Sequence, residues 1–261
     1  MSTLAFSRVG AEDAPHTAWI LHGILGAGRN WRSFARRLVA AHPDWAFVLP
    51  DLRNHGSTGP LPPPHGLVDC VADLDGLPDP EVVLGHSFGG KVALAWARDR
   101  GTARQVWVLD SIPVSSDGSD DSEVMHVLTS LERVSVPVAE RAEVRAELLG
   151  MGLSGMLVDW LLTSLEKGPH GWDWVYGLEG VHAMMADYFR TDFAGFLREH
   201  PGHPHIHIVR AMNSDRWTPD VLARIEAGPG VTLHELPDAG HWLHVDNPDG
   251  LLAMLAPTFA G

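Results

Sequence analysis

Short apolar runs, each bounded by Gly, Pro or Asp, recur along the chain and predict strands. Most of them lack alternation between apolar and polar positions, which is typical of strands buried on both faces of a parallel sheet. Runs with helical spacing of apolar residues fill the gaps between these strands. The predicted strands are 17–21, 46–49, 81–84, 105–109, 206–209 and 231–236, and the predicted helices are 31–41, 67–74, 91–100 and 248–259. This alternation favours a mostly parallel α/β sheet flanked by helices on both faces.

The alternation stops between residues 111 and 203. This segment begins with the polar stretch 115–121 and continues with helical patterns, clearest at 140–149 and 181–197. It contains no convincing strand pattern. We therefore expect residues 1–110 and 204–261 to form an α/β core, and residues 111–203 to form an all-helical lid inserted between two strands.

Charge and composition limit the possible partners of the chain. Its 261 residues carry a formal net charge of −14, which argues against nucleic-acid binding and against docking on anionic membranes. Cys70 is the only cysteine, so no disulfide can form within the chain. No apolar run approaches the roughly 18 residues of a membrane span, and no signal peptide is evident. We expect a soluble, cytoplasmic protein, and the sequence leaves its oligomeric state open.

The strongest chemical signal is the segment Gly85-His86-Ser87-Phe88-Gly89, between a predicted strand and a predicted helix. A G-x-S-x-G segment in this setting is typical of a nucleophile elbow, a turn so tight that its flanking positions must be glycine. Ser87 is therefore the candidate nucleophile.

A serine nucleophile needs a base, and in this type of fold the chain order is serine, acid, histidine. His241 follows the last predicted strand and is the candidate base; nearby His244 is its nearest competitor. Asp110 and Asp215 both follow strand ends, so spacing alone leaves the acid undecided between them. The remaining histidines, including His203, His205 and His207, have no partners at metal-ligand spacing, and we expect no metal site.

An oxyanion is expected to be stabilised by two backbone N–H groups. One comes from Phe88, the residue after the nucleophile. The second is expected from the loop after the first predicted strand, where Ile24 is the preferred donor and its neighbour Leu25 the alternative.

The motifs together resemble the α/β-hydrolase superfamily, and within it the small serine esterases that include bacterial short-chain acyl and acyl-CoA esterases and mitochondrial abhydrolase-domain proteins. The matching segments are 22–26 with Asn30 and Trp31, 51–57, 85–91, 108–113 and 239–244. The resemblance implies an α/β-hydrolase fold and places the acid at Asp110, whereas many other α/β-hydrolases place it where Asp215 stands. It also implies that Ser214 helps to hold the histidine and that segment 51–57 is a structured turn.

We expect a serine carboxylic-ester hydrolase that works through an acyl-enzyme and needs no cofactor. Because residues 111–203 contain 15 Asp and Glu but 6 Lys and Arg, we expect neutral rather than anionic substrates. An apolar pocket with few polar groups would suit small acyl or aryl esters. Thioesterase, perhydrolase, lactonase and carbon–carbon hydrolase activities stay open on the same machinery, as does a non-catalytic ligand-binding receptor. Seven large side chains on loops and in the lid are expected to line the pocket: Trp31, Trp172, Trp174, Met184, Met185, Trp217 and Trp242.

Overall fold

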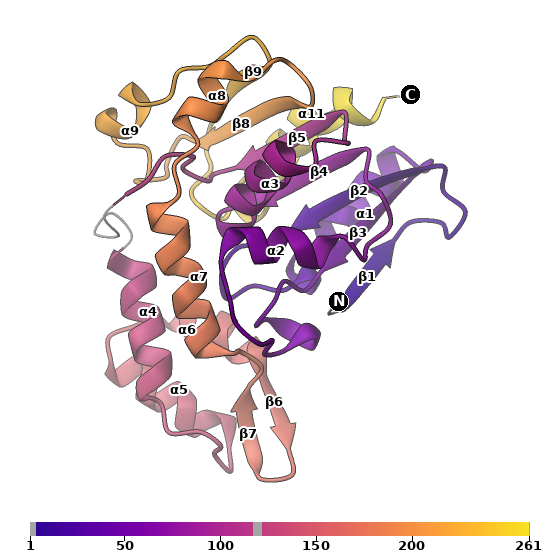
Figure 1. Cartoon of the computed structure of the whole chain (residues 1–261). Coiled ribbons are helices and arrows are strands. Elements are labelled where there is room, and N and C mark those ends of the chain that lie inside the picture. Colours follow the sequence, from indigo (N-terminus) through magenta and orange to yellow (C-terminus); the bar gives the residue numbers. More distant parts are fainter. Residues whose placement is uncertain (1–3, 117–121, 261) are drawn as a thin grey trace.

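The computed structural model describes residues 4–116 and 122–260, and a seven-stranded sheet forms its centre (Figure 1). The strand order is β1-β3-β2-β4-β5-β8-β9. All neighbouring pairs are parallel except β1 with β3, which is antiparallel. The strands are β1 (Phe6–Val9), β2 (His16–Leu21), β3 (Trp45–Pro50), β4 (Val82–His86), β5 (Gln105–Leu109), β8 (His205–Ala211) and β9 (Val231–Leu236). The six predicted strands correspond to β2, β3, β4, β5, β8 and β9, and β1 is the additional edge strand.

Helices cover both faces of the sheet, as the sequence predicts (Figure 1). Helices α2 and α3 pack on one face, and α1 and α11 pack on the other. The core helices are α1 (Arg32–Ala41), α2 (Leu67–Leu74), α3 (Phe88–Asp99), α9 (Pro219–Ala223), α10 (Leu243–Asp246) and α11 (Pro248–Phe259). Short 3-10 turns lie at Gly28–Trp31 and Gly56–Thr58. No helix within residues 4–116 and 122–260 is long and apolar enough to cross a membrane.

The apolar pattern of each helix explains why it packs where it does. In α1 the buried residues Phe34, Ala35 and Leu38 lie on one face, against the sheet. Helix α11 begins where the Asn247 side chain accepts a hydrogen bond from the Gly250 amide, with Pro248 as its first residue. Strand β4 is buried along its whole length and ends at the tight turn that leads into α3. That turn carries Ser87.

Residues 111–203, called the insertion below, are not all helical. The expectation of an all-helical segment is wrong because Leu165–Gly168 (β6) and Gly171–Trp174 (β7) form an antiparallel hairpin. The helices are α4 (Ser122–Arg133), α5 (Arg141–Gly150), α6 (Gly155–Leu161), α7 (Leu178–Arg190) and α8 (Ala194–Glu199), with a 3-10 turn at Leu162–Ser164. The predicted helix 181–197 is also not continuous, because α7 ends at Arg190 and α8 begins at Ala194.

The two ends of the insertion lie in different surroundings. Helix α7 runs beside α4 on one side and beside the core helices α2 and α3 on the other (Figure 1). Helix α8 instead lies beside β8 and β9, where the carbonyl of its buried Leu197 accepts a hydrogen bond from the Gly228 amide. The part of the insertion that stands apart from the sheet therefore ends with α7.

Candidate active site

Ser87 lies at the junction of β4 and α3, in a strained backbone conformation. Its φ of 52° and ψ of −119° are rarely adopted by a residue with a side chain. A Cβ atom at Gly85 would clash with the carbonyl oxygen of Gly89, and one at Gly89 would clash with the carbonyl oxygen of Leu21. The chain can therefore turn this sharply only with glycine at both positions, and the turn presents the Ser87 hydroxyl at the carboxyl edge of the sheet.

Asp110 follows β5 and is completely buried. Its Oδ2 accepts hydrogen bonds from His241 Nδ1 and from the Ser214 hydroxyl, both at 2.8 Å. Its Oδ1 accepts from the Trp217 indole N–H at 2.6 Å and from the Ala211 amide at 3.1 Å. Burial alone would raise the pKa of Asp110, but these hydrogen bonds outweigh it and hold the pKa below its ordinary value. The side chain is therefore a carboxylate at neutral pH.

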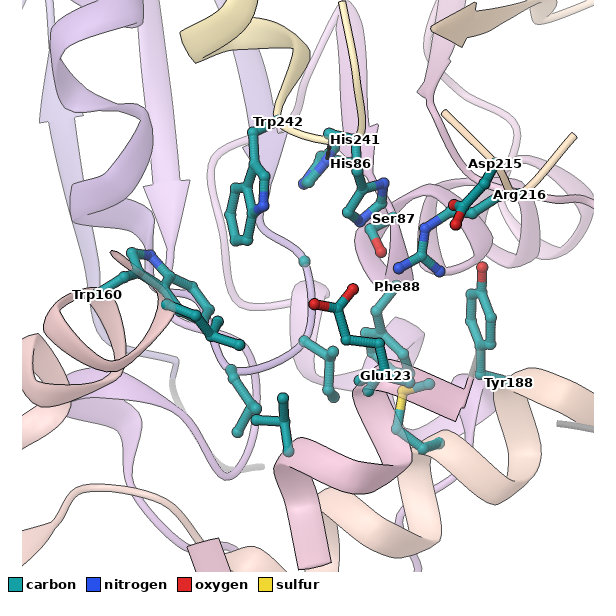
Figure 2. Close-up of a pocket in the computed structure, with 17 residues that line it drawn as sticks. His86, Ser87, Phe88, Glu123, Trp160, Tyr188, Asp215, Arg216, His241 and Trp242 are labelled. Carbon is teal, nitrogen blue, oxygen red and sulfur yellow. Dashed lines mark hydrogen bonds between the residues drawn. The ribbon is translucent and has the colours of Figure 1, made fainter. Parts of the chain in front are cut away.

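His241 lies in the loop after β9, with Nδ1 directed at Asp110. Burial is the largest influence on its pKa and lowers it; the hydrogen bond to Asp110 opposes this, and the nearby Arg216 cation lowers it further. His86 holds the same loop, because its Nε2 is hydrogen-bonded to the His241 carbonyl oxygen at 2.8 Å. Ser87 and His241 line the same pocket (Figure 2). The imidazole is thus neutral near pH 7 and fixed in the tautomer with Nδ1 protonated.

Asp215, the other candidate acid, is exposed at the pocket rather than buried behind the histidine. Its neighbour Ser214 donates to Asp110, so it holds the histidine through the carboxylate rather than directly. His244, the competing base, stacks on Trp31 with ring centroids 3.9 Å apart. Burial lowers the pKa of His244 to about 4. The residue that receives the imidazole N–H is therefore Asp110.

The loop after β2 lies against the elbow, close enough that a Cβ on Gly23 would meet the Ser87 Cβ at 3.2 Å. The Leu25 amide is already used, because it donates to His55 Nε2 at 3.0 Å. The Ile24 amide donates to no group within residues 4–116 and 122–260. The Phe88 amide is in the first turn of α3, where helix N–H groups lack partners within the helix. Ile24 and Phe88 both line the pocket, so their amides are the free pair beside Ser87.

Two buried histidines fix this loop from behind. His55 and His22 each accept a backbone N–H at Nε2, from Leu25 and Leu52 respectively, and each hydrogen-bonds a neighbouring carbonyl through Nδ1. Burial lowers the pKa of His22 to about 4 and that of His55 to about 3, so both stay neutral as this pattern requires. Segment 51–57 therefore has a structural contact with the oxyanion loop, and none of its residues lines the pocket.

The pocket is a small cavity of about 140 Å³ between the core loops and the insertion. From the core it is lined by Gly23, Ile24, Leu25, His86, Ser87, Phe88, Asp215, Arg216, His241 and Trp242, and from the insertion by Glu123, Val124, Val127, Leu157, Trp160, Met185 and Tyr188. Trp160 and Trp242 lie together on one side, with ring centroids 4.8 Å apart, and Tyr188 and Arg216 lie on the other (Figure 2). Most of this lining is apolar.

Of the seven side chains expected in the pocket, only Met185 and Trp242 line it. Trp31 packs under His244, and Trp217 donates to Asp110. Met184 faces the opposite way, where its sulfur accepts from Asn54 Nδ2 at 3.4 Å. Trp172 and Trp174 belong to the hairpin β6–β7, where Trp174 stacks on Tyr176. These five were wrongly assigned to the pocket because loop position does not reveal which way a side chain points.

Sequence reasoning missed the charged lining of the pocket. The carboxylate of Glu123, in the first turn of α4, and the guanidinium of Arg216 both point into the cavity (Figure 2). Desolvation by burial lowers the pKa of Arg216, although Asp110 opposes the shift. Arg216 directly follows the candidate acid Asp215, and this adjacency was the only available signal. Tyr188 and Trp160 offered none beyond apolar helical spacing.

The histidine-rich strand β8 forms a side-chain cluster elsewhere in the fold. His207 Nδ1 and His234 Nε2 are hydrogen-bonded at 2.9 Å, and His207 stacks on Trp107 with centroids 4.0 Å apart. In the described part of the chain, no three His, Cys, Asp or Glu side chains are grouped so that they could hold a metal ion.

Comparisons with known proteins agree on one family. The model described as "Alpha/beta hydrolase family" matches residues 20–254. The mouse sn-1-specific diacylglycerol lipase ABHD11 is 27% identical over 244 residues, covering 89% of this chain and 77% of that protein. The Escherichia coli esterase YbfF is 27% identical over 248 residues, covering 89% of each chain. A solved structure of a marine microorganism esterase has a TM-score of 0.84 at 23% identity over all of both chains, a likeness of fold.

Proposed function

Since the chain belongs to the alpha/beta hydrolase family and is an esterase-type hydrolase, we propose that it cleaves small carboxylic esters through an acyl-enzyme formed on Ser87. One observation carries the proposal. The buried Asp110 carboxylate is hydrogen-bonded at 2.8 Å to the Nδ1 of a neutral His241, in the pocket that Ser87 enters from a strained elbow. This is the arrangement in which a serine hydroxyl becomes a nucleophile at neutral pH.

In the acylation step, Ser87 Oγ attacks the ester carbonyl while His241 Nε2 takes the hydroxyl proton. Asp110 stabilises the imidazolium that forms, because it stays ionised in the field of its four hydrogen-bond donors. The Ile24 and Phe88 amides donate to the oxyanion of the tetrahedral intermediate. His241 then protonates the leaving alcohol, and the acyl group stays on Ser87.

In the deacylation step, His241 Nε2 removes a proton from a water molecule, which attacks the acyl carbon. The bond between the acyl carbon and Ser87 Oγ then breaks, His241 returns the proton to Ser87 Oγ, and the acid is released. The same amide pair stabilises the second oxyanion. Neither step uses a cofactor, because His241 takes up and returns each proton and the other reactants are the ester and water.

The pocket favours a small and neutral substrate. Its volume of about 140 Å³ is below the roughly 300–1,000 Å³ common for drug-sized ligands, and its walls are mostly apolar. Glu123 and Asp215 outnumber Arg216 among the charged lining residues, and the insertion itself has an excess of nine acids. This excess of negative charge in the pocket lining and in the insertion disfavours the approach of anionic substrates. Residues of the insertion thus act as a lid that selects neutral acyl or aryl esters.

The test compares Ser87→Ala with wild type on p-nitrophenyl acetate and butyrate. We expect a loss of at least about 10⁴-fold in kcat, as when the nucleophile of such a triad is removed. Ser33→Ala, an exposed serine on α1, serves as the matched control and keeps full activity. Activity retained in Ser87→Ala, or absent from the wild type on every ester and thioester tried, would contradict the proposal.

A further inference from the structure

Lys91 is a buried cation that the proposed reaction does not use. Only 1% of its surface is exposed, although lysine is rarely buried this completely. Its Nζ donates three hydrogen bonds to backbone carbonyl oxygens: Val114 at 2.9 Å, Tyr188 at 2.6 Å and Thr191 at 2.8 Å. An ammonium group has three N–H donors, so all of them are satisfied.

The three carbonyls come from the two ends of the part of the insertion that stands apart from the sheet. Val114 lies on the segment that leaves β5 after Asp110, and Tyr188 and Thr191 lie where α7 ends. Two backbone hydrogen bonds join the same two ends, from the Ser116 amide to the Phe189 carbonyl and from the Phe193 amide to the Pro113 carbonyl. Lys91 thus ties this junction to the core helix α3 through three hydrogen bonds at once.

Charged groups surround the ammonium. Burial is the largest influence and lowers the pKa of Lys91 to about 7; Asp192 and Asp187 oppose this, and Arg224 adds to it. Arg224 Nη2 also donates to Asp192 at 2.6 Å and to the Ser115 hydroxyl at 2.9 Å, on the exposed side of the junction. The Tyr188 ring lies 4.4 Å from Nζ. A buried ammonium is expensive to desolvate, so it is retained only because the carbonyls and the ring compensate it.

The junction is continuous with the pocket. Lys91 lies one turn along α3 from Phe88, the proposed oxyanion donor, and the Phe88 and Tyr188 rings are 5.9 Å apart. Tyr188 and Met185 are the residues of α7 that line the pocket. We propose that Lys91 is a positioning residue that fastens both ends of this part of the insertion to α3. It thereby holds Tyr188 and Met185, which form one wall of the pocket, against the active site.

The proposal separates the wall of the pocket from the catalytic groups. Asp110 and His241 are held by their own hydrogen bonds to core residues, and none of these bonds involves Lys91. Lys91→Met keeps the length of the side chain but leaves three buried carbonyls without a donor. The wall becomes mobile, while the groups that react with the smallest esters stay in place.

The test measures hydrogen exchange and kinetics in Lys91→Met. Lys167→Met is the matched control, since Lys167 is the only other lysine and is exposed on the hairpin β6–β7. We expect the Ser116 and Phe193 amides to exchange at least about tenfold faster in Lys91→Met, while the buried amides of β4 keep wild-type rates. We expect KM for p-nitrophenyl hexanoate to rise about tenfold and kcat for the acetate to change less than threefold.

Uniformly faster exchange, with kcat reduced equally on all esters and KM unchanged, would mean a merely structural lysine and would overturn the proposal. Lys91→Arg keeps the charge and several donors, and it is expected to restore part of the affinity for the hexanoate. If Lys91→Met does not fold, acetylation of the wild type by an N-hydroxysuccinimide ester decides the matter. Lys167 is then expected to react and Lys91 to be protected, and equal reactivity would contradict the proposal.

The kinetic part of this test rests on the proposed esterase function, but the exchange and acetylation measurements do not. A chain that shows protected Lys91 and local exchange changes without hydrolysing esters would refute the function and leave the fastening role intact. A chain that hydrolyses esters with an unprotected Lys91 would do the reverse.

Discussion

The two halves of the pocket are built in different ways. On the core side, polar groups have defined partners: Asp110 accepts four hydrogen bonds, and His22 and His55 are each held through both ring nitrogens. On the side of the insertion, the lining consists mainly of apolar and aromatic side chains, and Glu123 is the one carboxylate among the described residues there.

This difference indicates which side of the pocket determines the rate of the chemical steps and which side determines substrate binding. Hydrogen bonds fix atoms to within a few tenths of an ångström, which proton transfer requires. Apolar contacts exclude water and set the size of the cavity, and they tolerate substitution more easily. We therefore expect core substitutions to act on kcat, and substitutions in the insertion to act on KM and on the choice of acyl group.

Among the groups that assist Ser87, the largest effect on kcat is expected from the buried acid. Asp110→Asn should lower kcat on p-nitrophenyl butyrate by about 10³–10⁴-fold, because an amide neither orients the imidazole correctly nor stabilises its charged form. Asp215→Asn should change kcat less than threefold, since Asp215 is exposed at the pocket. If the Asp215 substitution alone abolished turnover, the core would be organised around a different acid.

A smaller effect is expected from a donor to that acid. Trp217→Phe keeps most of the buried ring but removes the N–H that lies 2.6 Å from Asp110, which should lower kcat about tenfold. Trp19→Phe is the control, because the Trp19 indole donates to the Pro78 carbonyl, away from the pocket. Equal losses of kcat in the two variants would show that tryptophan truncation acts through stability alone.

Substitutions in the insertion should change KM rather than kcat. Trp160→Ala removes half of the aromatic pair with Trp242, and we expect KM for p-nitrophenyl hexanoate to rise about tenfold with little change in kcat for the acetate. Trp172→Ala, in the same insertion but outside the pocket, should leave both unchanged. A fall in kcat on all esters in Trp160→Ala would mean that the insertion takes part in the chemistry.

The pH dependence of kcat/KM tests how burial and the neighbouring Arg216 affect the pKa of His241. His241 must be neutral to accept a proton, so kcat/KM should rise with pH through the pKa of His241, which burial holds below the ordinary histidine value of 6.5. Arg216→Met removes a cation that contributes to the lowering, and the rising limb should move to higher pH. The limb is measured from kcat/KM profiles; a shift to lower pH would contradict the assignment.

The smallest effect concerns charge. The acidic insertion should disfavour acyl-CoA thioesters relative to neutral esters of the same acyl group at low salt. Raising the ionic strength screens the repulsion between the acidic insertion and the anionic substrate. The kcat/KM for acyl-CoA should therefore rise a few-fold, while kcat/KM for the neutral ester stays constant. Comparable kcat/KM values for the two substrates at low salt would contradict the proposed role of the acidic insertion.

The sequence was most informative where burial decides structure. The predicted α/β-hydrolase fold is confirmed, because six strands carry continuous apolar runs and their helices have clear stripes. The edge strand β1 was missed because Phe6–Val9 is largely unburied and has no apolar run. The hairpin β6–β7 was missed for a related reason, since Leu165–Gly168 is mostly exposed and polar.

The candidate site shows the same division. Ser87, His241 and Phe88 could be named as candidates from motifs, since chain order and strand ends bring them to one edge of the sheet. The motifs left the acid open between Asp110 and Asp215, where only the family resemblance favoured Asp110, and they left the second amide open between Ile24 and Leu25. Apart from Met185 and Trp242, the walls of the pocket could not be named, because the direction of a tryptophan such as Trp31 or Trp217 depends on contacts between segments far apart in sequence. Arg216 and Glu123 were missed because a charge next to a loop or helix start is ordinarily solvated.

The central claim is that the core alone carries out the chemistry, on Ser87. Its most direct test is labelling with a fluorophosphonate probe followed by mass spectrometry of the peptides. The account predicts one phosphonylated residue per chain, Ser87, with labelling lost in Ser87→Ala and kept in Trp160→Ala. Failure of Ser87 to react in the folded wild type, or labelling that persists in Ser87→Ala, would contradict it.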